Sequence, residues 1–345
     1  MKNLSFRPLV RLLALSLALT WLHPALAEEL ADPSLQRIKD MVAATLKFLK
    51  ELQQLPALHL AHPDHAQMVG AANAGARIVA VGDHGTVLLS DDDGKTWRQA
   101  REVPTRVMLT SVSFVDDKQG WAVGHWGSVI HTEDGGETWK LLRTDTTVDQ
   151  PLFSVYFADP SNGMAVGLWS LALRSTDGGV SWTPLKMPAP PGADKSGPNL
   201  YQIFPARKGL LYIAGEQGLV FRSADGGESW NLLKTGNAGS FWTGLALPDD
   251  ALLVAGLNGK IFRSTDSGKT WSDVPSGVTG SITSLAAGPD GSVTGVGLEG
   301  AMVSSKDGTS FAPEIRADRA SLTAALVTSK GSLRLFSKDG VVEAK

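Results

Sequence analysis

One short acidic turn recurs five times along this chain of 345 residues, in nearly the same letters each time. It reads SDDDGKTW at 90–97, HTEDGGETW at 131–139, STDGGVSW at 175–182, SADGGESW at 223–230 and STDSGKTW at 264–271. A worn sixth copy lies within VGLEGAMVSSKDGTSF at 296–311. Repetition at a period on the order of forty residues is typical of solenoids and propellers, which are built from stacked copies of one small unit.

Each turn belongs to a longer unit with the pattern of four short strands. In the second unit the alternating runs are LTSVSFV (109–115), GWAVG (120–124), SVIHT (128–132) and TWKLL (138–142). Alternation of apolar and polar residues with a period of two indicates strands, and the Gly-rich stretches between them indicate turns. Four antiparallel strands per repeat predict the blade of a β-propeller.

The number of units can be counted from the turn between the second and third strands. Its last residue recurs at Gly85, Gly127, Ser170, Gly218, Gly259, Gly300 and Gly340. The last unit, SLRLFSKDGVVEA (332–344), ends before a fourth strand. We therefore predict an all-β, seven-bladed propeller over 55–345 in which the segment Leu55–Leu60 supplies the missing strand and closes the ring. A solenoid is the alternative, but it would need polar caps at both ends, which the sequence lacks.

The N-terminal part has a different pattern. Residues 1–27 carry three positive charges, an apolar stretch and small residues up to Ala27, which predicts a secretory signal peptide cleaved after that residue and a periplasmic or secreted protein. Apolar residues at helical spacing then predict a helix within the segment 28–54. This helix either packs against the propeller or docks a partner.

Composition excludes several classes of function. The chain has no cysteine, so disulfides, thiolate metal sites and a covalent lipid anchor on cysteine are excluded. Its formal net charge is −3, and no basic stripe is present, which argues against nucleic acid as a partner. We expect no cofactor and no metal.

The repeated turn, which we call the Asp box, is predicted to be structural. Its carboxylate can accept hydrogen bonds from its own turn, and its Trp is predicted to fill the space between neighbouring blades. The carboxylates are Asp92, Asp134, Asp177, Asp225 and Asp266, and the indoles are Trp97, Trp139, Trp182, Trp230 and Trp271.

Two functional interpretations of the Asp box are weaker. The acidic run at 91–93 resembles the start of a calcium loop, but no bidentate Glu follows at the required offset. Sialidases also carry this box, but their chemistry needs a Tyr nucleophile and converging arginines. The three tyrosines, Tyr156, Tyr201 and Tyr212, all fall on predicted strands. We therefore predict a non-catalytic protein.

The chain resembles the Ycf48/Hcf136-like family over about residues 65–345. The segments that carry the resemblance are GWAVGHWGSVIHTEDGGETW (120–139), LYIAGEQGLVFRSADGGESW (211–230) and GLNGKIFRSTDSGKTW (256–271). The resemblance implies a seven-bladed propeller, and for plant and cyanobacterial members it implies a role in photosystem II assembly. Relatives in non-photosynthetic bacteria are exported and are sometimes encoded beside resistance-nodulation-division type transporters. For this chain the resemblance implies a scaffold with a protein partner, a membrane protein or its exported domain.

The turns between second and third strands are predicted to gather on one face, opposite the Asp boxes. Polar and aromatic groups on short rigid turns are typical of a binding surface, although they could equally surround a solvated funnel. Trp126 and Trp169 lie outside the box register and are the best candidates to grip a peptide or a sugar. The predicted partner-binding residues are His84, His125, Trp126, Trp169, Glu216, Gln217, Asn258 and Glu299.

Two further interpretations of the sequence remain open. His59, His62, Asp64 and His65 could ligate zinc or copper, although a polar loop is the more common role of such a segment. A carbohydrate-binding protein or glycoside hydrolase using the funnel is the alternative function, and it would need opposed carboxylates such as Glu216 and Glu299.

Overall fold

The computed structural model describes residues 33–345 except 54, 146, 191, 193–196 and 343–345. The predicted signal peptide, 1–27, lies outside the described residues. The described chain divides after Gln53 into two units, of which the first contains the helix α3 (Pro33–Gln53) and the second contains all the strands. The helix predicted within 28–54 is therefore present. Among the described residues, no helix combines the length and the apolar character that crossing a membrane requires.

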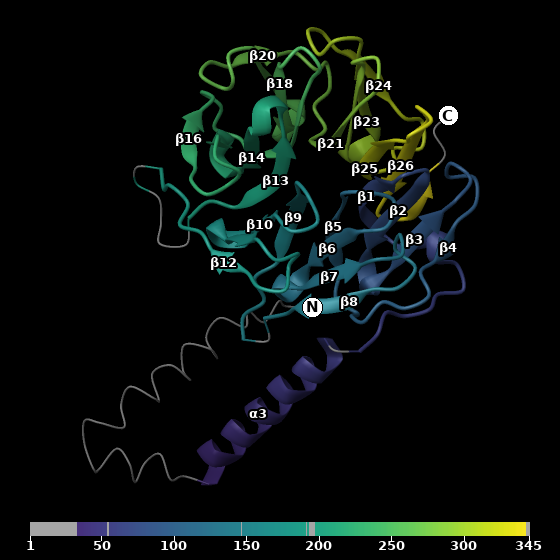
Figure 1. Ribbon diagram of the computed structural model, residues 1–345, viewed down its shortest axis with the longest axis vertical. Helices are drawn as coiled ribbons and strands as arrows, with labels where there is room; N and C mark the ends of the chain where they lie inside the picture. The colour runs from purple at the N-terminus through teal and green to yellow at the C-terminus, as the bar shows by residue number, and fades with distance from the viewer. Residues whose placement is uncertain (1–32, 54, 146, 191, 193–196, 343–345) are drawn as a thin grey trace. The chain divides into compact units, whose positions relative to one another are not determined.

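The second unit is a ring of seven antiparallel sheets, as the repeats predict (Figure 1). In chain order the first four sheets are β1 (Met68–Ala74), β2 (Arg77–Gly82), β3 (Val87–Ser90) and β4 (Arg98–Gln99); β5 (Leu109–Phe114), β6 (Gly120–Gly124), β7 (Val129–Thr132) and β8 (Lys140–Arg143); β9 (Leu152–Phe157), β10 (Gly163–Gly167), β11 (Ala172–Ser175) and β12 (Thr183–Pro184); and β13 (Leu200–Pro205), β14 (Leu211–Gly215), β15 (Leu219–Ser223) and β16 (Asn231–Lys234). The others are β17 (Phe241–Ala246), β18 (Leu252–Gly256), β19 (Ile261–Ser264) and β20 (Ser272–Val274); β21 (Ile282–Ala287), β22 (Val293–Gly297), β23 (Ala301–Ser305) and β24 (Ala312–Ile315); and β25 (Leu322–Val327), β26 (Leu333–Ser337) and β27 (Gly340–Val342).

The first strand of every sheet lies innermost and lines a central channel. Inner strands of successive blades contact one another around the ring, and β25 of the last blade contacts β1 of the first. Four of the seven second strands, β6, β10, β14 and β18, are buried along their whole length, because each sheet is covered by a neighbour on both faces.

Closure of the ring differs from the sequence prediction. The last sheet has three strands among the described residues, and the segment Leu55–Leu60 is not one of them. That segment lies along the first blade, where Ala57 donates its N–H to the Val103 carbonyl. The Gln99 side-chain amide donates to the Leu58 carbonyl and accepts the N–H of Leu60. The predicted closing strand is therefore wrong.

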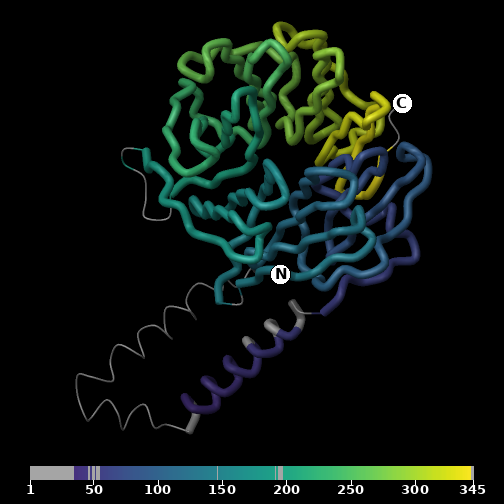
Figure 2. Tube along the Cα trace, viewed as in Figure 1, coloured from purple at the N-terminus to yellow at the C-terminus, as the bar shows by residue number. Residues whose placement is uncertain are grey.

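Side-chain contacts between the first and last blades hold the ends of the ring together. Figure 2 shows the C-terminal blade, in yellow, beside the first blade, in blue. Arg334 of β26 pairs with the Asp93 carboxylate at 3.3 Å and donates to the Asp93 carbonyl, and Asn73 donates to Val327. Trp97 meets the buried ring of Phe336 edge-on, with centroids 5.7 Å apart.

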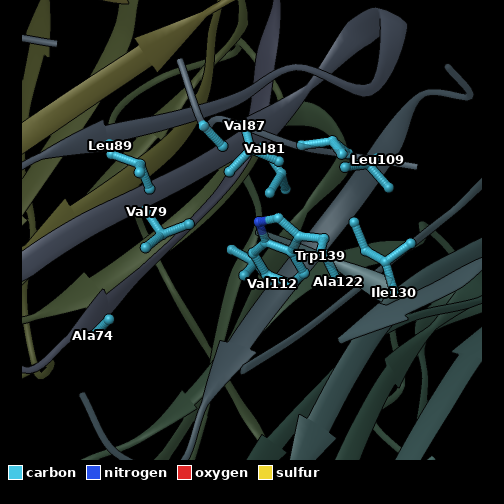
Figure 3. Close-up of a cluster of buried hydrophobic side chains, with 12 residues drawn as sticks. Ala74, Val79, Val81, Val87, Leu89, Leu109, Val112, Ala122, Ile130 and Trp139 are labelled. Carbon is cyan, nitrogen blue, oxygen red and sulfur yellow. The ribbon is translucent and has the colours of Figure 1, made fainter. Parts of the chain in front are cut away.

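The Asp boxes behave as predicted. In the second blade Asp134 accepts hydrogen bonds from the Thr132 hydroxyl and from both the N–H and the hydroxyl of Thr138. Trp139 is only 4% exposed and donates its indole N–H to Gly136. Its ring packs with Val79 of the first blade and Val112 of the second (Figure 3), so the Trp is a wedge between blades.

Candidate functional site: the rim face and the central channel

In the first six blades the turn between the second and third strands is a single turn of 3-10 helix, and its middle residue is a non-glycine residue in the left-handed backbone region. That residue is His84, Trp126, Trp169, Gln217, Asn258 or Glu299 in successive blades, with φ between 53° and 60°. We call the face that carries these turns the rim face. All but Trp126 are exposed, and Trp126 is half-buried. Non-glycine residues rarely adopt this conformation, and it directs each side chain outward from a rigid turn.

Around the second blade, the rim residues are fixed by an acidic partner. Asp149 pairs with the His125 ring at 3.2 Å, and its other oxygen accepts the Trp126 N–H at 2.9 Å. The Trp126 carbonyl in turn accepts the N–H of Asp145. The connection from β8 to β9 is thereby fastened to the rim turn.

Trp169, in the third blade, is the most exposed of the rim aromatics, with 43% of its surface accessible. Ser170, which occupies the place of glycine in the other rim turns, also has a positive φ, of 57°. Its hydroxyl and its N–H both donate to the Pro198 carbonyl at 2.9 Å. The end of the Pro-rich connection between β12 and β13 is therefore held against the turn that presents Trp169.

Glu216 has a structural partner on the same face. Its carboxylate accepts the N–H of Asn199 at 2.9 Å, and the Asn199 side chain accepts the N–H of Trp169 at 3.0 Å. Glu216 therefore helps to fix the neighbouring aromatic turn.

The central channel is a cavity of about 520 Å³ lined by the inner strands of all seven blades. Its wall consists of small, hydroxyl-bearing, amide and apolar residues, and the described residues that line it include no Asp, Glu, His, Lys or Arg. Four large rings line it: Phe114 at the end of β5 and, near the start of their strands, Phe153 of β9, Tyr201 of β13 and Trp242 of β17. Phe153 and Tyr201 are stacked, with centroids 5.7 Å apart.

Phe153, Tyr201 and Trp242 were not among the residues predicted for the site, because the prediction considered the turns and not the inner strands. Tyr156, Tyr201 and Tyr212 do lie on strands, as predicted. A signal was present: the residue after the first buried apolar residue of each inner strand is Thr in three repeats and aromatic in three others. Aligning the repeats at that position would have found them.

The histidine cluster is looser than a metal site. The His62 and His65 rings lie 5.7 Å apart, and Asp64 is 3.7 Å from His65. Within the described ranges, no group of three or more His, Cys, Asp or Glu residues could hold a metal ion.

The sequence pattern of the family described as "Photosynthesis system II assembly factor YCF48" matches residues 99–188 and 141–322. No curated protein is significantly similar in sequence to this chain.

Solved structures share the fold at low sequence identity. A structure titled "YCF48 bound to D1 peptide" is 19% identical, covers 83% of this chain and 97% of its own, and has a TM-score of 0.65. YCF48 from Cyanidioschyzon merolae is 16% identical over 81% of this chain and 95% of its own, also with a TM-score of 0.65. Virginiamycin B lyase from Staphylococcus aureus is 14% identical over 82% and 96% of the two chains, with a TM-score of 0.66.

Proposed function

Because this chain belongs to the family of the photosystem II assembly factor YCF48, we propose that it is a non-catalytic propeller scaffold that binds a segment of a protein partner on its rim face. The observation that carries the proposal is the family match together with the likeness to a YCF48 structure bound to a D1 peptide. The geometry of the rim face adds support. Rigid turns there hold His84, Trp169 and Gln217 outward, where they are free to contact a partner.

We further propose that the protein is exported and assists a membrane complex or a transporter. The support is the pattern of residues 1–27, which is that of a secretory signal, and the exported relatives that the family resemblance implies. Fractionation of cells followed by N-terminal sequencing checks this point. A protein that starts after Ala27 in the exported fraction agrees with it, and an uncleaved cytoplasmic protein contradicts it.

A carbohydrate-active protein is the second candidate, favoured by the aromatic and hydroxyl groups that line the channel. A two-carboxylate hydrolase would need opposed acids, and the channel wall has none. Glu216, one candidate on the rim face, already accepts the backbone N–H of Asn199. Hydrolysis of a glycan panel that is lost in Glu216→Gln would support the enzyme and overturn the scaffold.

Site-specific photocrosslinking in living cells tests the scaffold directly. A photoreactive residue replaces Trp169 on the rim face, and in a matched variant it replaces Val180, which is 71% exposed in the Asp box of the same blade. We expect a discrete crosslinked protein from position 169 and none from position 180. Equal crosslinking from both positions, or only from 180, would contradict the rim face as the binding surface.

A further inference from the structure

Every inner strand carries a β-bulge at the same place. The register between the first and second strands of each blade shifts after the first buried apolar residue, so that the next residue is left without a partner. A bulge re-aims the side chain of its extra residue. The seven extra residues all line the channel and lie near its rim-face end: Val69, Thr110, Phe153, Tyr201, Trp242, Thr283 and Thr323.

Threonine at this position ties neighbouring blades together. The Thr110 hydroxyl donates to the carbonyl of Leu152, the first residue of the next inner strand, at 2.6 Å. Thr283 donates to Leu322 in the same way at 2.8 Å, and Thr323 closes the series by donating to Met68 of the first blade. Threonine is therefore the residue that favours ring stability here.

Four blades lack this threonine: the first has Val69, and three consecutive blades carry an aromatic residue instead. Phe153, Tyr201 and Trp242 stand where Thr would form the tie, and they place three partly exposed rings on consecutive inner strands near the channel mouth, with Phe153 and Tyr201 stacked. We call these three residues the aromatic crescent. No hydrogen bond of the Tyr201 hydroxyl or the Trp242 indole is found in the described part of the chain. Departures from a repeated structural pattern are expected at functional positions.

The chemistry of the wall limits what the crescent can bind. The polar side chains one step deeper already accept backbone N–H groups of the next blade: Ser154 from Ile203, Gln202 from Gly244, and Thr243 from Leu285. With no charged group on the wall, a charged ligand group would lose its hydration without gaining a partner. An uncharged apolar group does not meet this obstacle, and the faces of the three rings offer it an apolar surface.

We infer that the aromatic crescent is the anchor socket for one apolar side chain, aromatic or large aliphatic, of the polypeptide segment bound at the rim face. The inference rests on the proposed function and specifies the partner's chemistry at this site. The crescent opens at the rim-face end of the channel, where the inner strands begin, so a segment lying on the rim face can insert a side chain there. Aromatic-lined pockets are where buried anchor residues contribute most to binding.

The test uses random peptides displayed on phage and selected against the full-length chain, with synthetic versions of the enriched peptides measured by calorimetry. Enriched peptides are expected to share one Phe, Tyr, Trp or Leu. The double variant Tyr201→Thr/Trp242→Thr installs the residue found in three of the other four blades, so it should fold with an unchanged or higher melting temperature. Its affinity should fall about tenfold or more. Val180→Thr, an apolar-to-Thr change on the opposite face, is the matched control and should bind as the parent does.

Two measurements need no protein variant. Replacing the shared apolar residue of the peptide by Asp should weaken binding to the parent chain by about tenfold or more. A benzophenone at the same peptide position should crosslink to β9, β13 or β17.

The outcomes separate the two proposals. Peptides whose affinity is unchanged by the double variant and whose crosslinks fall outside the channel would overturn the anchor socket and leave the scaffold intact. Failure to enrich any peptide would overturn both. Displacement of a bound peptide by maltose or N-acetylglucosamine would assign the channel to carbohydrate and overturn the socket.

Discussion

The two faces of the ring use their turns in opposite ways. On the face that carries the Asp boxes, which we call the box face, each Asp accepts hydrogen bonds from its own turn. Asp225, for example, accepts from the Ser223 hydroxyl and from the N–H and hydroxyl of Ser229. On the rim face the corresponding residues, such as Gln217 and Asn258, differ from blade to blade and are exposed. The box turns repeat because the fold depends on them. The rim turns share a backbone and vary in side chain, which leaves their chemistry available to a partner.

The largest loss of stability is expected when a tryptophan of an Asp box is removed. Trp139→Ala would leave a cavity between the first and second blades, and we expect a loss of about 3–5 kcal/mol in the free energy of unfolding. Trp169→Ala on the rim face is the matched control, with an expected change within about 0.5 kcal/mol. Urea denaturation followed by circular dichroism measures both. Comparable losses would show that Trp169 is part of the core.

A smaller effect is expected from a box carboxylate. Asp134→Ala removes the acceptor of three hydrogen bonds that close one turn, which should cost about 1–2 kcal/mol. Gln217→Ala, at a rim turn, should change stability by less than about 0.5 kcal/mol. The shift in the urea midpoint at constant slope checks both variants. A rim variant as damaging as the box variant would remove the distinction between the faces.

Lowering the pH should reduce the stability contributed by a single Asp box, by less than removal of its carboxylate does. Hydrogen bonds from the Thr96 hydroxyl and N–H lower the pKa of Asp92 from 3.8 to about 2, and those from the Thr270 N–H and hydroxyl lower the pKa of Asp266 to about 2. A carboxyl with a lower pKa in the folded state binds fewer protons there than when unfolded. Stability from these boxes is therefore complete above about pH 4 and is lost as the pH falls towards 2.

Urea midpoints measured across this pH range test the point. The parent should lose stability over the window, and Asp92→Asn should lose less because it no longer titrates there. An identical slope in both proteins would show that this box does not contribute to the acid sensitivity.

The smallest effect on stability, and the largest on binding, is expected at the rim face. Combining Trp169→Ala with Gln217→Ala should leave the melting temperature within about 2 °C. The same variant should lose the in-cell crosslinks that the parent gives from a neighbouring rim position, such as His84. Retained crosslinks would place the partner elsewhere, and a large fall in melting temperature would assign these residues to the fold.

Much of the fold was determined by short-range patterns. Each box carries its own hydrogen-bond partners within four residues, as between Asp177 and Ser181, so its structure can be predicted from eight letters. Counting the units at Gly85 and its successors predicts seven blades correctly. The rim turns were also predicted on one face, because strands in an antiparallel blade alternate in direction.

The tertiary structure alone decided how the ring closes and what lines its centre. Closure joins Asp93 to Arg334 and Asn73 to Val327, contacts between residues more than two hundred positions apart for which no local pattern exists. The Leu58 carbonyl accepts a hydrogen bond from the Gln99 side chain of the first blade. The segment Leu55–Leu60 therefore lies along that blade instead of completing the last sheet. The aromatic crescent likewise comes from three repeats and becomes a single site only because the ring brings their inner strands around one axis.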